Sequence, residues 1–307
     1  MLLGLPSFEY FSCKTVEEAC SLLSTYDDEA QVFAGGTDLL VKMKHRKATP
    51  RILVNIKKIP NLDYIRYDEG DGLKIGALAT IESLAGSSVL TKSFSGLREA
   101  ASVLGTPHVR SLATLGGNLC NASPAAECAP ALLVMDAKVK IVGREGEERI
   151  VPLESFFTGP GKTVLKRNEI ITEIQVPDPP PRTGGLHLKF GSRRVDIAVA
   201  GVSILMTVDG EQCQDVKIAL SAVGPTPFRA KKAEAVLRGE MLSVEKGDLI
   251  AEAAKIASEE SSPIDDMRGR ADHRRHLVEV MVADGMRRLI SEMITRKAGS
   301  KREIRLN

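Results

Sequence analysis

Two short segments of the chain combine adjacent glycines with hydroxyl and amide side chains, a combination that suits a phosphate ligand. They are residues 34–40 (AGGTDLL) and residues 114–124 (TLGGNLCNASP), about 80 residues apart. Because glycine lacks a Cβ, the backbone can approach an anion closely and adopt positive φ, which aims consecutive N–H groups at phosphate oxygens. Thr37, Thr114 and Asn118 add side-chain donors. We therefore expect both loops to bind one diphosphate.

The context of these loops matters, because a single Gly-Gly pair is most often only a turn. Neither loop matches G-x-G-x-x-G or G-x-x-x-x-G-K-[ST], which argues against a Rossmann or P-loop nucleotide site. Around the first loop the sequence predicts a strand at residues 31–33 and a helical segment from residue 38 to 43. Strand, glycine turn and helix start form an order typical of anion-binding sites. A dinucleotide fold of another kind is therefore required.

The size and composition of the chain indicate globular domains. Its 307 residues are 43% apolar and 27% charged, so the chain can bury more than one core. The 42 basic and 40 acidic side chains give a net charge of +2, which argues against a nucleic-acid partner. Basic residues concentrate only at residues 296–305, where no aromatic residue is interleaved. This favours a solvated terminus or a subunit contact.

The sequence carries no clear signal for a membrane, for secretion or for a metal. No apolar run reaches the roughly 20 residues of a membrane span, and the first residues lack the pattern of a signal peptide, so we expect a cytoplasmic location. The five cysteines are scattered and include no C-x-x-C pair. This argues against a disulfide framework and against a zinc or iron–sulfur site of standard spacing. We expect no metal site on this chain.

The apolar pattern predicts an α+β chain whose first two lobes end near residue 177. Thr15 and Glu18 form a capping box that predicts a helix over residues 16–26, and period-two alternation predicts a buried strand over residues 51–56. A first lobe would cover about residues 1–57 and a second lobe about residues 58–177. The second lobe is expected to contain strands at 62–66, 73–77 and 169–176, a helix at 95–104, and a hairpin of 137–142 with 148–151.

A change of composition marks the expected domain boundary. Residues 177–185 (PDPPPRTGG) contain too many prolines and glycines to continue a helix or a strand, so we expect a linker at residues 178–188. A smaller α+β domain at residues 189–296 and a basic tail at 297–307 would follow. The expected elements of that domain are strands at 197–208 and 216–222 and amphipathic helices at 243–260 and 272–296.

The ordered set of motifs resembles the FAD-binding medium subunit of the molybdenum hydroxylases. This family includes the flavin subunits or domains of xanthine, nicotinate and carbon monoxide dehydrogenases and of 4-hydroxybenzoyl-CoA reductase. The resemblance implies a two-lobed FAD-binding domain of the PCMH or vanillyl-alcohol-oxidase class, with the flavin between the lobes. It also implies a C-terminal domain of the CO dehydrogenase flavoprotein type that covers part of the cofactor. The motifs lie at residues 34–38, 113–118, 122–127, 156–162, 189–190, 193–198 and 222–227.

The resemblance also implies which residues contact a non-covalently bound FAD. The first loop would wrap the diphosphate, the second loop would hold it from the other lobe, and apolar side chains would pack against the ring system. The implied contacts are Val32, Phe33, Ala34, Gly35, Gly36, Thr37, Asp38, Leu39, Leu104, Thr114, Gly116, Gly117, Asn118, Cys120, Ser123, Glu127, Ile171 and Lys189.

Some of the polar positions leave alternatives open. Glu127 stands where the family more often has Asp; it either accepts from ribityl or ribose hydroxyls or is an ordinary acid at a helix start. Lys189 is either a cation that raises the flavin potential or a surface lysine at a strand edge. Arg193, Arg194 and Asp196 either border the ring or form a surface ion-pair set.

The resemblance assigns the substrate chemistry to other chains. A large partner would hold a molybdenum–pterin centre, and a small partner two [2Fe–2S] clusters. This chain would carry FAD alone and pass electrons to NAD⁺ or another acceptor. No catalytic residue is expected, because the five histidines are isolated or lie in Arg-rich contexts. A self-contained flavoprotein oxidase or reductase and a flavin-free scaffold remain as alternatives.

Overall fold

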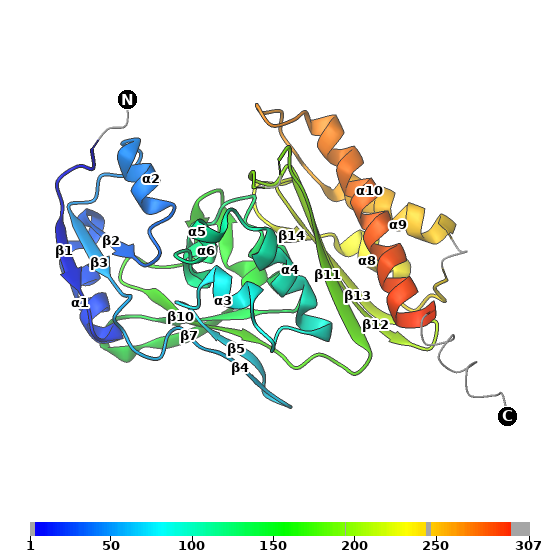
Figure 1. Ribbon diagram of the computed structural model, residues 1–307, viewed down its shortest axis with the longest axis horizontal. Coiled ribbons are helices and arrows are strands. Elements are labelled where there is room, and N and C mark those ends of the chain that lie inside the picture. Colours follow the sequence, from blue (N-terminus) through cyan, green and yellow to red (C-terminus); the bar gives the residue numbers. More distant parts are fainter. Residues whose placement is uncertain (1–3, 194, 244–246, 296–307) are drawn as a thin grey trace.

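The computed structural model describes residues 4–193, 195–243 and 247–295, and it confirms the expected mixed α+β fold. Three main sheets follow one another along the chain. Figure 1 shows them side by side, from the blue N-terminal lobe on the left to the orange-red helix α10 on the right. Arg194 and the basic tail at 297–307, on which the sequence made predictions, lie outside the described residues.

The first lobe is built on a small parallel sheet with the strand order β1-β3-β2. The predicted cap forms at the start of the first helix, with the Glu18 carboxylate bonded one residue before the cap residue Thr15. The Thr15 hydroxyl accepts from the N–H of Glu18 at 3.1 Å, and the Glu18 carboxylate accepts from the N–H of Lys14 at 2.8 Å. The elements of this lobe are β1 (Glu9–Ser12), α1 (Val16–Tyr26), η1 (Asp27–Glu29), β2 (Ala30–Phe33), α2 (Leu39–Lys44) and β3 (Ile52–Asn55).

The second lobe is a five-stranded antiparallel sheet, in the order β4-β5-β10-β6-β7, packed against short helices. The predicted hairpin forms, whereas the strand expected at residues 62–66 begins three residues later. The strands are β4 (Ile65–Asp68), β5 (Gly72–Gly76), β6 (Lys138–Val142), β7 (Glu148–Pro152), β10 (Ile170–Val176) and the ribbon of β8 (Phe157–Gly159) with β9 (Lys162–Thr163). The helices are α3 (Ile81–Ala85), η2 (Lys92–Phe94), α4 (Ser95–Val103), α5 (Pro107–Arg110), α6 (Leu115–Cys120), α7 (Cys128–Val134), η3 (Arg144–Gly146) and η4 (Leu153–Ser155).

The C-terminal domain is a four-stranded antiparallel sheet with helices on one face. Figure 1 shows α8, α9 and α10 on the outer face of this sheet, while α4 of the second lobe lies on the other side. The elements are β11 (Thr183–Phe190), β12 (Ala200–Asp209), β13 (Gln212–Ser221), β14 (Phe228–Arg229), α8 (Lys231–Leu237), α9 (Gly247–Glu260), α10 (Ala271–Ile290) and η5 (Ser291–Thr295).

The structure differs from the expected linker at residues 178–188, because strand β11 already begins at Thr183. The two glycines that suggested a linker are tight packing positions inside this strand. A Cβ on Gly184 would lie 2.6 Å from the Met293 sulfur, and one on Gly185 would lie 3.3 Å from the Ser93 carbonyl oxygen. Glycine in a strand often marks such a close approach of neighbouring groups.

The C-terminal sheet shares a hydrophobic core with the second lobe. Leu205 of β12 and Ala219 of β13 are buried in the same cluster as Leu97 of α4 and Leu132 of α7. A separate cluster fills the space between the sheet and α8–α10. The sheet therefore has one apolar face toward its own helices and a mixed face toward the second lobe.

Candidate functional site

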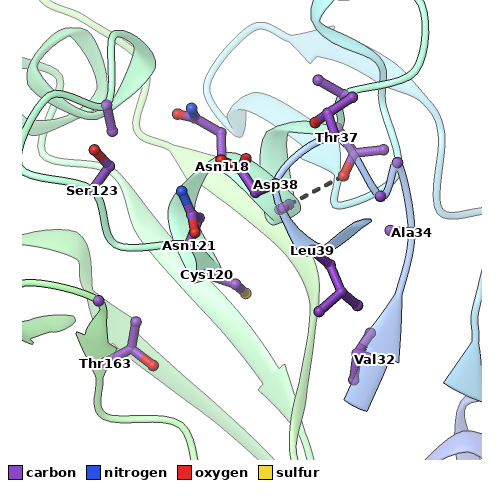
Figure 2. Close-up of a pocket in the computed structure, with 18 of the residues that line it drawn as sticks. Val32, Ala34, Thr37, Asp38, Leu39, Asn118, Cys120, Asn121, Ser123 and Thr163 are labelled. Atoms are coloured by element: carbon purple, nitrogen blue, oxygen red, sulfur yellow. Dashed lines mark hydrogen bonds between the residues drawn. The ribbon is translucent and has the colours of Figure 1, made fainter. Parts of the chain in front are cut away.

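A cleft of about 970 Å³ separates the first lobe from the second. One wall is the loop between β2 and α2, and the opposite wall is formed by α6 and the residues that follow it. Figure 2 shows Val32 and Leu39 on one side facing Cys120, Asn121 and Ser123 on the other. The β8–β9 ribbon closes a third side, and residues 195–197 of the C-terminal domain complete the lining.

Most of the contact residues proposed from the sequence line this one cleft. The structure thus brings together segments that are far apart in the chain, although the role of each residue stays a prediction. The proposed residues found in the lining are Val32, Ala34, Gly35, Gly36, Thr37, Asp38, Leu39, Leu104, Thr114, Gly116, Gly117, Asn118, Cys120, Ser123, Glu127 and Ile171.

Phe33 and Lys189 are the two proposed residues outside the lining. Alternation along β2 turns Val32 toward the cleft and Phe33 away from it. The Phe33 ring instead contacts Tyr10 edge to face, with ring centroids 6.2 Å apart, and lies 5.0 Å from the Lys57 ammonium. Its side chain thus supports the loop from behind.

The glycine amides of the two loops differ, which departs from the expectation that both loops aim glycine N–H groups at a ligand. In the first loop, the N–H groups of Gly36, Thr37 and Asp38 donate to no acceptor within the described part of the chain. In the second loop, Gly116 donates to the carbonyl of Ala77 at 2.9 Å, and Gly117 donates to the Thr114 hydroxyl at 3.1 Å. Free glycine and neighbouring amides therefore come from the first loop, whereas in the second loop the N–H groups that donate to no described acceptor are found at Thr114 and Ser123, not at the glycines.

The glycines themselves are required for different reasons. A Cβ on Gly35 would fall within 3.0 Å of the Leu112 backbone, and one on Gly116 would lie 2.8 Å from the Ala77 carbonyl oxygen, so both are packing positions. Gly36 has a φ of 72°, a conformation that favours glycine. Beside Gly117 a Cβ would meet only the Thr114 hydroxyl, at 2.9 Å. Gly117 is therefore the glycine whose side faces the cleft most freely.

Polar side chains of the second wall include one that lacks a partner. The Oδ1 atom of Asn118 is buried and has no hydrogen-bond partner among the described residues. Asn121 Oδ1 accepts from the Lys42 ammonium at 2.6 Å, a contact that joins the two lobes. Burial raises the pKa of the Asp38 carboxyl, and the nearby Lys42 charge partly opposes this rise. As the pH falls, Asp38 therefore takes up a proton at a higher pH than an exposed aspartate does.

Glu127 and Lys189 form a buried ion pair behind the cleft. The Lys189 ammonium donates to Glu127 Oε1 at 2.9 Å and to the Val103 carbonyl at 3.0 Å. The two side chains are 5% and 11% exposed, for Lys189 and Glu127 respectively. Lys189 is therefore not a surface lysine, and its charge reaches the cleft through Glu127, which does line it.

Several lining residues were not among the proposed contacts. Lys42 lies one turn after Asp38, and Asn121 and Thr163 also line the cleft. Thr163 ends strand β9, and the β8–β9 ribbon overlaps the family motif at residues 156–162. That motif could therefore have indicated that the ribbon contributes to the site. Of the set with open roles, Asp196 lines the cleft, whereas Arg193 is exposed and accepts from the N–H of Asp196 through its carbonyl at 3.1 Å.

Two features that could suggest other chemistry are not found in the described residues. Residues 4–193, 195–243 and 247–295 contain no group of three or more His, Cys, Asp and Glu side chains arranged to hold a metal. Over the same ranges, no helix has both the length and the apolar character that crossing a membrane requires.

Comparison with known families assigns both domains. Residues 6–179 match the model of the FAD binding domain in molybdopterin dehydrogenase, and residues 189–289 match the CO dehydrogenase flavoprotein C-terminal domain. The chain belongs to the FAD-binding medium-subunit family of the molybdenum hydroxylases. The resemblance inferred from the motifs is thereby confirmed.

Individual relatives of the family agree along nearly their whole length. The chain is 34% identical to the carbon monoxide dehydrogenase medium chain of Hydrogenophaga pseudoflava, over 90% of this chain and 95% of that one. It is 30% identical to the xanthine dehydrogenase FAD-binding subunit of Escherichia coli O157:H7, over 94% and 97%. A solved structure of the H. pseudoflava carbon monoxide dehydrogenase superposes with a TM-score of 0.88, covering 92% of this chain and 97% of that one.

The cleft fits the FAD that this family binds. Unpaired N–H groups on the first wall suit an anionic diphosphate, and the orphan Asn118 oxygen suits a hydroxyl or amino donor of a ligand. Apolar side chains of Leu104 and Ile171 line the same cleft and suit a flat ring system. The donor set of this chain is therefore consistent with FAD as its cofactor.

Proposed function

We propose that this chain is the FAD-carrying electron-transfer subunit of a multi-subunit molybdenum hydroxylase. A large partner with a molybdenum–pterin centre would oxidise the substrate, and a small partner with two [2Fe–2S] clusters would deliver the electrons. This chain would then pass them to NAD⁺ or another acceptor. The observation that carries the proposal is the two-walled cleft, with free backbone donors on one wall and Asn118 on the other.

Different residues of the cleft would contact different parts of the cofactor. The free N–H groups of residues 36–38 would bind the diphosphate, and Asn118 and Ser123 would hydrogen-bond to the sugar or ribityl part. Leu104 and Ile171 would exclude water from one side of the ring. When bound, FAD supplies the ability to exchange electrons singly and in pairs, so the chain needs no nucleophile of its own.

The Glu127–Lys189 pair would set the charge beside the flavin. A cation close to a ring that gains negative charge favours the reduced form and raises the potential. The Lys189 ammonium donates to Glu127, which lines the cleft. Replacement of Lys189 by Met removes this positive charge, so the variant should retain FAD but have a lower flavin potential. An unchanged redox titration would remove Lys189 from this role.

A spectroscopic and biochemical test separates this function from its alternatives. The purified chain should show the absorption of bound oxidised flavin, and it should turn over no small substrate without its partners. A chain that stays colourless after incubation with FAD would support the flavin-free scaffold, and turnover by the chain alone would support a self-contained oxidase or reductase. Both outcomes contradict the proposal.

Co-purification of the chain with its partners tests the composition of the complex. We expect co-purification of a large molybdenum-containing chain and a small iron-containing chain, from the cytoplasmic fraction. The choice of substrate, xanthine-dehydrogenase-like or another, would rest with the large chain. A screen of NAD⁺, ferredoxin and quinones against the reduced complex would identify the acceptor. Iron found in the isolated chain itself would contradict FAD as its only prosthetic group.

A further inference from the structure

A buried polar cluster lies in the seam between the second lobe and the C-terminal sheet. In the register of this sheet, Lys189 pairs with Gly201, and Gly201 pairs with Ser221 on the next strand. Two residues back along β11, on the next row of the same face, His187 pairs with Ser203. Because alternate residues of a strand share a face, His187 and Lys189 point to the same side of the sheet. Lys189 contacts the second lobe, so this is the side that faces the seam.

Two polar atoms in this cluster are buried without a partner. His187 Nε2 and Ser221 Oγ make no hydrogen bond to any of the residues that the structure describes. The residues are only 6% and 1% exposed, respectively. A buried polar atom left unpaired destabilises the fold, so such atoms normally bind protein or ordered water. Two of them in one seam point to a shared ligand.

The position of Gly201 shows that the two side chains lie close to each other. A Cβ built on Gly201 would fall within 3.0 Å of Ser221 Oγ and 3.8 Å from His187 Cε1, the ring carbon between Nδ1 and Nε2. The serine hydroxyl and the imidazole edge therefore both lie beside this glycine. Any larger residue at position 201 would collide with the hydroxyl.

The Lys189 ammonium is a third polar group on this face of β11, close enough to affect His187 by its charge. An ammonium has three donors, and those of Lys189 have two partners, the Val103 carbonyl and Glu127 Oε1. Its side chain is 5% exposed, so the third donor has little access to bulk solvent. A buried water molecule typically makes about three hydrogen bonds to groups of this kind.

We propose that one buried water molecule lies beside Gly201, bound by His187 Nε2, Ser221 Oγ and the third N–H of Lys189, and that it positions the Lys189 ammonium against Glu127. This "seam water site" makes His187 a positioning residue for the ion pair. The effect on the flavin rests on the function proposed for Lys189, whereas the water site itself does not.

The protonation state of the imidazole agrees with this arrangement. Burial and the adjacent Lys189 charge lower the pKa of His187 to about 3, so the ring is neutral at neutral pH. Nδ1 lies 2.8 Å from Ser203 Oγ, and in the tautomer in which Nδ1–H donates to this hydroxyl, Nε2 is the acceptor and takes a proton donor such as water. The Glu99 carboxylate accepts from the backbone N–H of His187 at 2.8 Å and holds this part of β11 in place.

A crystal structure that shows ordered solvent tests the site directly. We expect one water molecule within hydrogen-bonding distance of His187 Nε2, Ser221 Oγ and Lys189 Nζ. A direct contact between the imidazole and the serine hydroxyl, a space filled by another side chain, or an anion in place of water would overturn the proposal. In a Ser221→Ala variant the water should be lost or weakly ordered.

The positioning role needs a measurement that mere stability would not change. We expect His187→Phe, which keeps the volume but has no acceptor, to shift the midpoint potential of the bound flavin in the same direction as Lys189→Met. His187→Gln, whose amide oxygen can accept near the place of Nε2, should restore most of the original potential. Ser221→Ala should act in the same direction as His187→Phe, with a smaller effect.

A double-variant comparison decides whether His187 acts through Lys189. In the Lys189→Met background, His187→Phe should cause no further shift of the flavin potential. An equal shift in both backgrounds, or no shift in either His187→Phe or Ser221→Ala chains that retain FAD, would overturn the positioning role. If Lys189→Met leaves the potential unchanged, the positioning role and the function proposed for Lys189 both fail, while the crystallographic result still decides the water site.

Discussion

At the scale of single residues, the two walls of the cleft bind by different means. The first loop offers backbone N–H groups that no acceptor in the described chain uses, whereas in the second loop the N–H groups of Gly116 and Gly117 already donate to the Ala77 carbonyl and the Thr114 hydroxyl. On that second wall the unpaired oxygen of Asn118 is the clearest binding group. The identity of this side chain should therefore matter more for FAD than the glycine amides around it.

Replacement of Asn118 by Ala should weaken FAD binding roughly tenfold. The variant loses the unpaired Oδ1 together with the amide donors, and a ligand group left without its partner in a buried site costs about 1–3 kcal/mol. Titration of the flavin-free chain with FAD, followed by calorimetry, measures the change in Kd. Gln214→Ala, an exposed amide on β13, is the matched control and should leave Kd unchanged. Equal affinity in both variants would exclude Asn118 from the site.

The buried His187 should make the stability of the chain depend on pH. Its folded pKa of about 3 lies below the ordinary value of 6.5, so the unfolded state binds the proton more readily. The stabilisation is complete above pH 6.5 and is lost as the pH falls from 6.5 toward 3. Lys189, Glu99 and Glu127 are the charged groups nearby.

The measurement compares denaturant unfolding at pH 6.5 and pH 5. Between these values the wild-type chain should lose about 2 kcal/mol more of its unfolding free energy than His187→Gln, which has no group to titrate there. Identical losses in the two chains would mean that the imidazole is not held neutral in the folded state.

At the scale of elements, the loop between β2 and α2 is held by direct contact with the second lobe. A Cβ on Gly35 would fall within 3.0 Å of the Leu112 backbone, and Lys42 of α2 donates to Asn121 across the cleft. The glycine is thus needed for the approach of two protein segments, not only for the approach of a ligand. This contact fixes the width of the cleft.

Gly35→Ala should destabilise the fold and weaken FAD binding together. The added methyl group has to push the first lobe away from Leu112, and overpacking of this kind costs about 1–3 kcal/mol. Thermal unfolding and FAD titration measure the two effects. Gly4→Ala serves as the control, since a Cβ there meets nothing within 4 Å, and it should change neither quantity. Lower affinity at unchanged stability would show that Gly35 acts on the ligand alone.

At the scale of the whole molecule, the seam joins the two domains that the family models separate. Interactions that cross it include apolar contacts of Leu205 and Ala219 with the second lobe, the buried Glu127–Lys189 pair, and the backbone bond from Ala222 to the Pro124 carbonyl at 2.7 Å. The last of these lies directly beside the cleft loop. The C-terminal sheet therefore acts as a structural wall for the cofactor domain.

We expect the FAD-binding and C-terminal domains to unfold in one cooperative transition. The shared core and the buried ion pair would both be exposed if either domain unfolded alone, and a buried charge without its partner costs about 3–5 kcal/mol. Differential scanning calorimetry of the intact chain should show a single peak. Two separate peaks, with the second retained by a chain truncated after residue 182, would contradict this.

Local patterns in the sequence were sufficient to predict most of the larger elements. Thr15 and Glu18 determine where α1 begins, and apolar alternation placed β3, β6, β7 and β10 close to their observed positions. The family could also be identified from short motifs, because their order along the chain is specific even though each is weak. Strand β11 was missed, because its glycines look like a linker until the packing against Ser93 and Met293 is seen.

The sequence by itself determined which kinds of residue line the cleft, since glycine pairs, amides and hydroxyls indicate a phosphate or sugar ligand wherever they lie in the chain. Only the tertiary structure decided which backbone donors stay free, which glycines serve packing, and where the Lys189 charge goes. The physical reason is that hydrogen bonds and burial depend on the neighbours in space. Those neighbours, such as Ala77 for Gly116 and Glu127 for Lys189, come from distant parts of the chain.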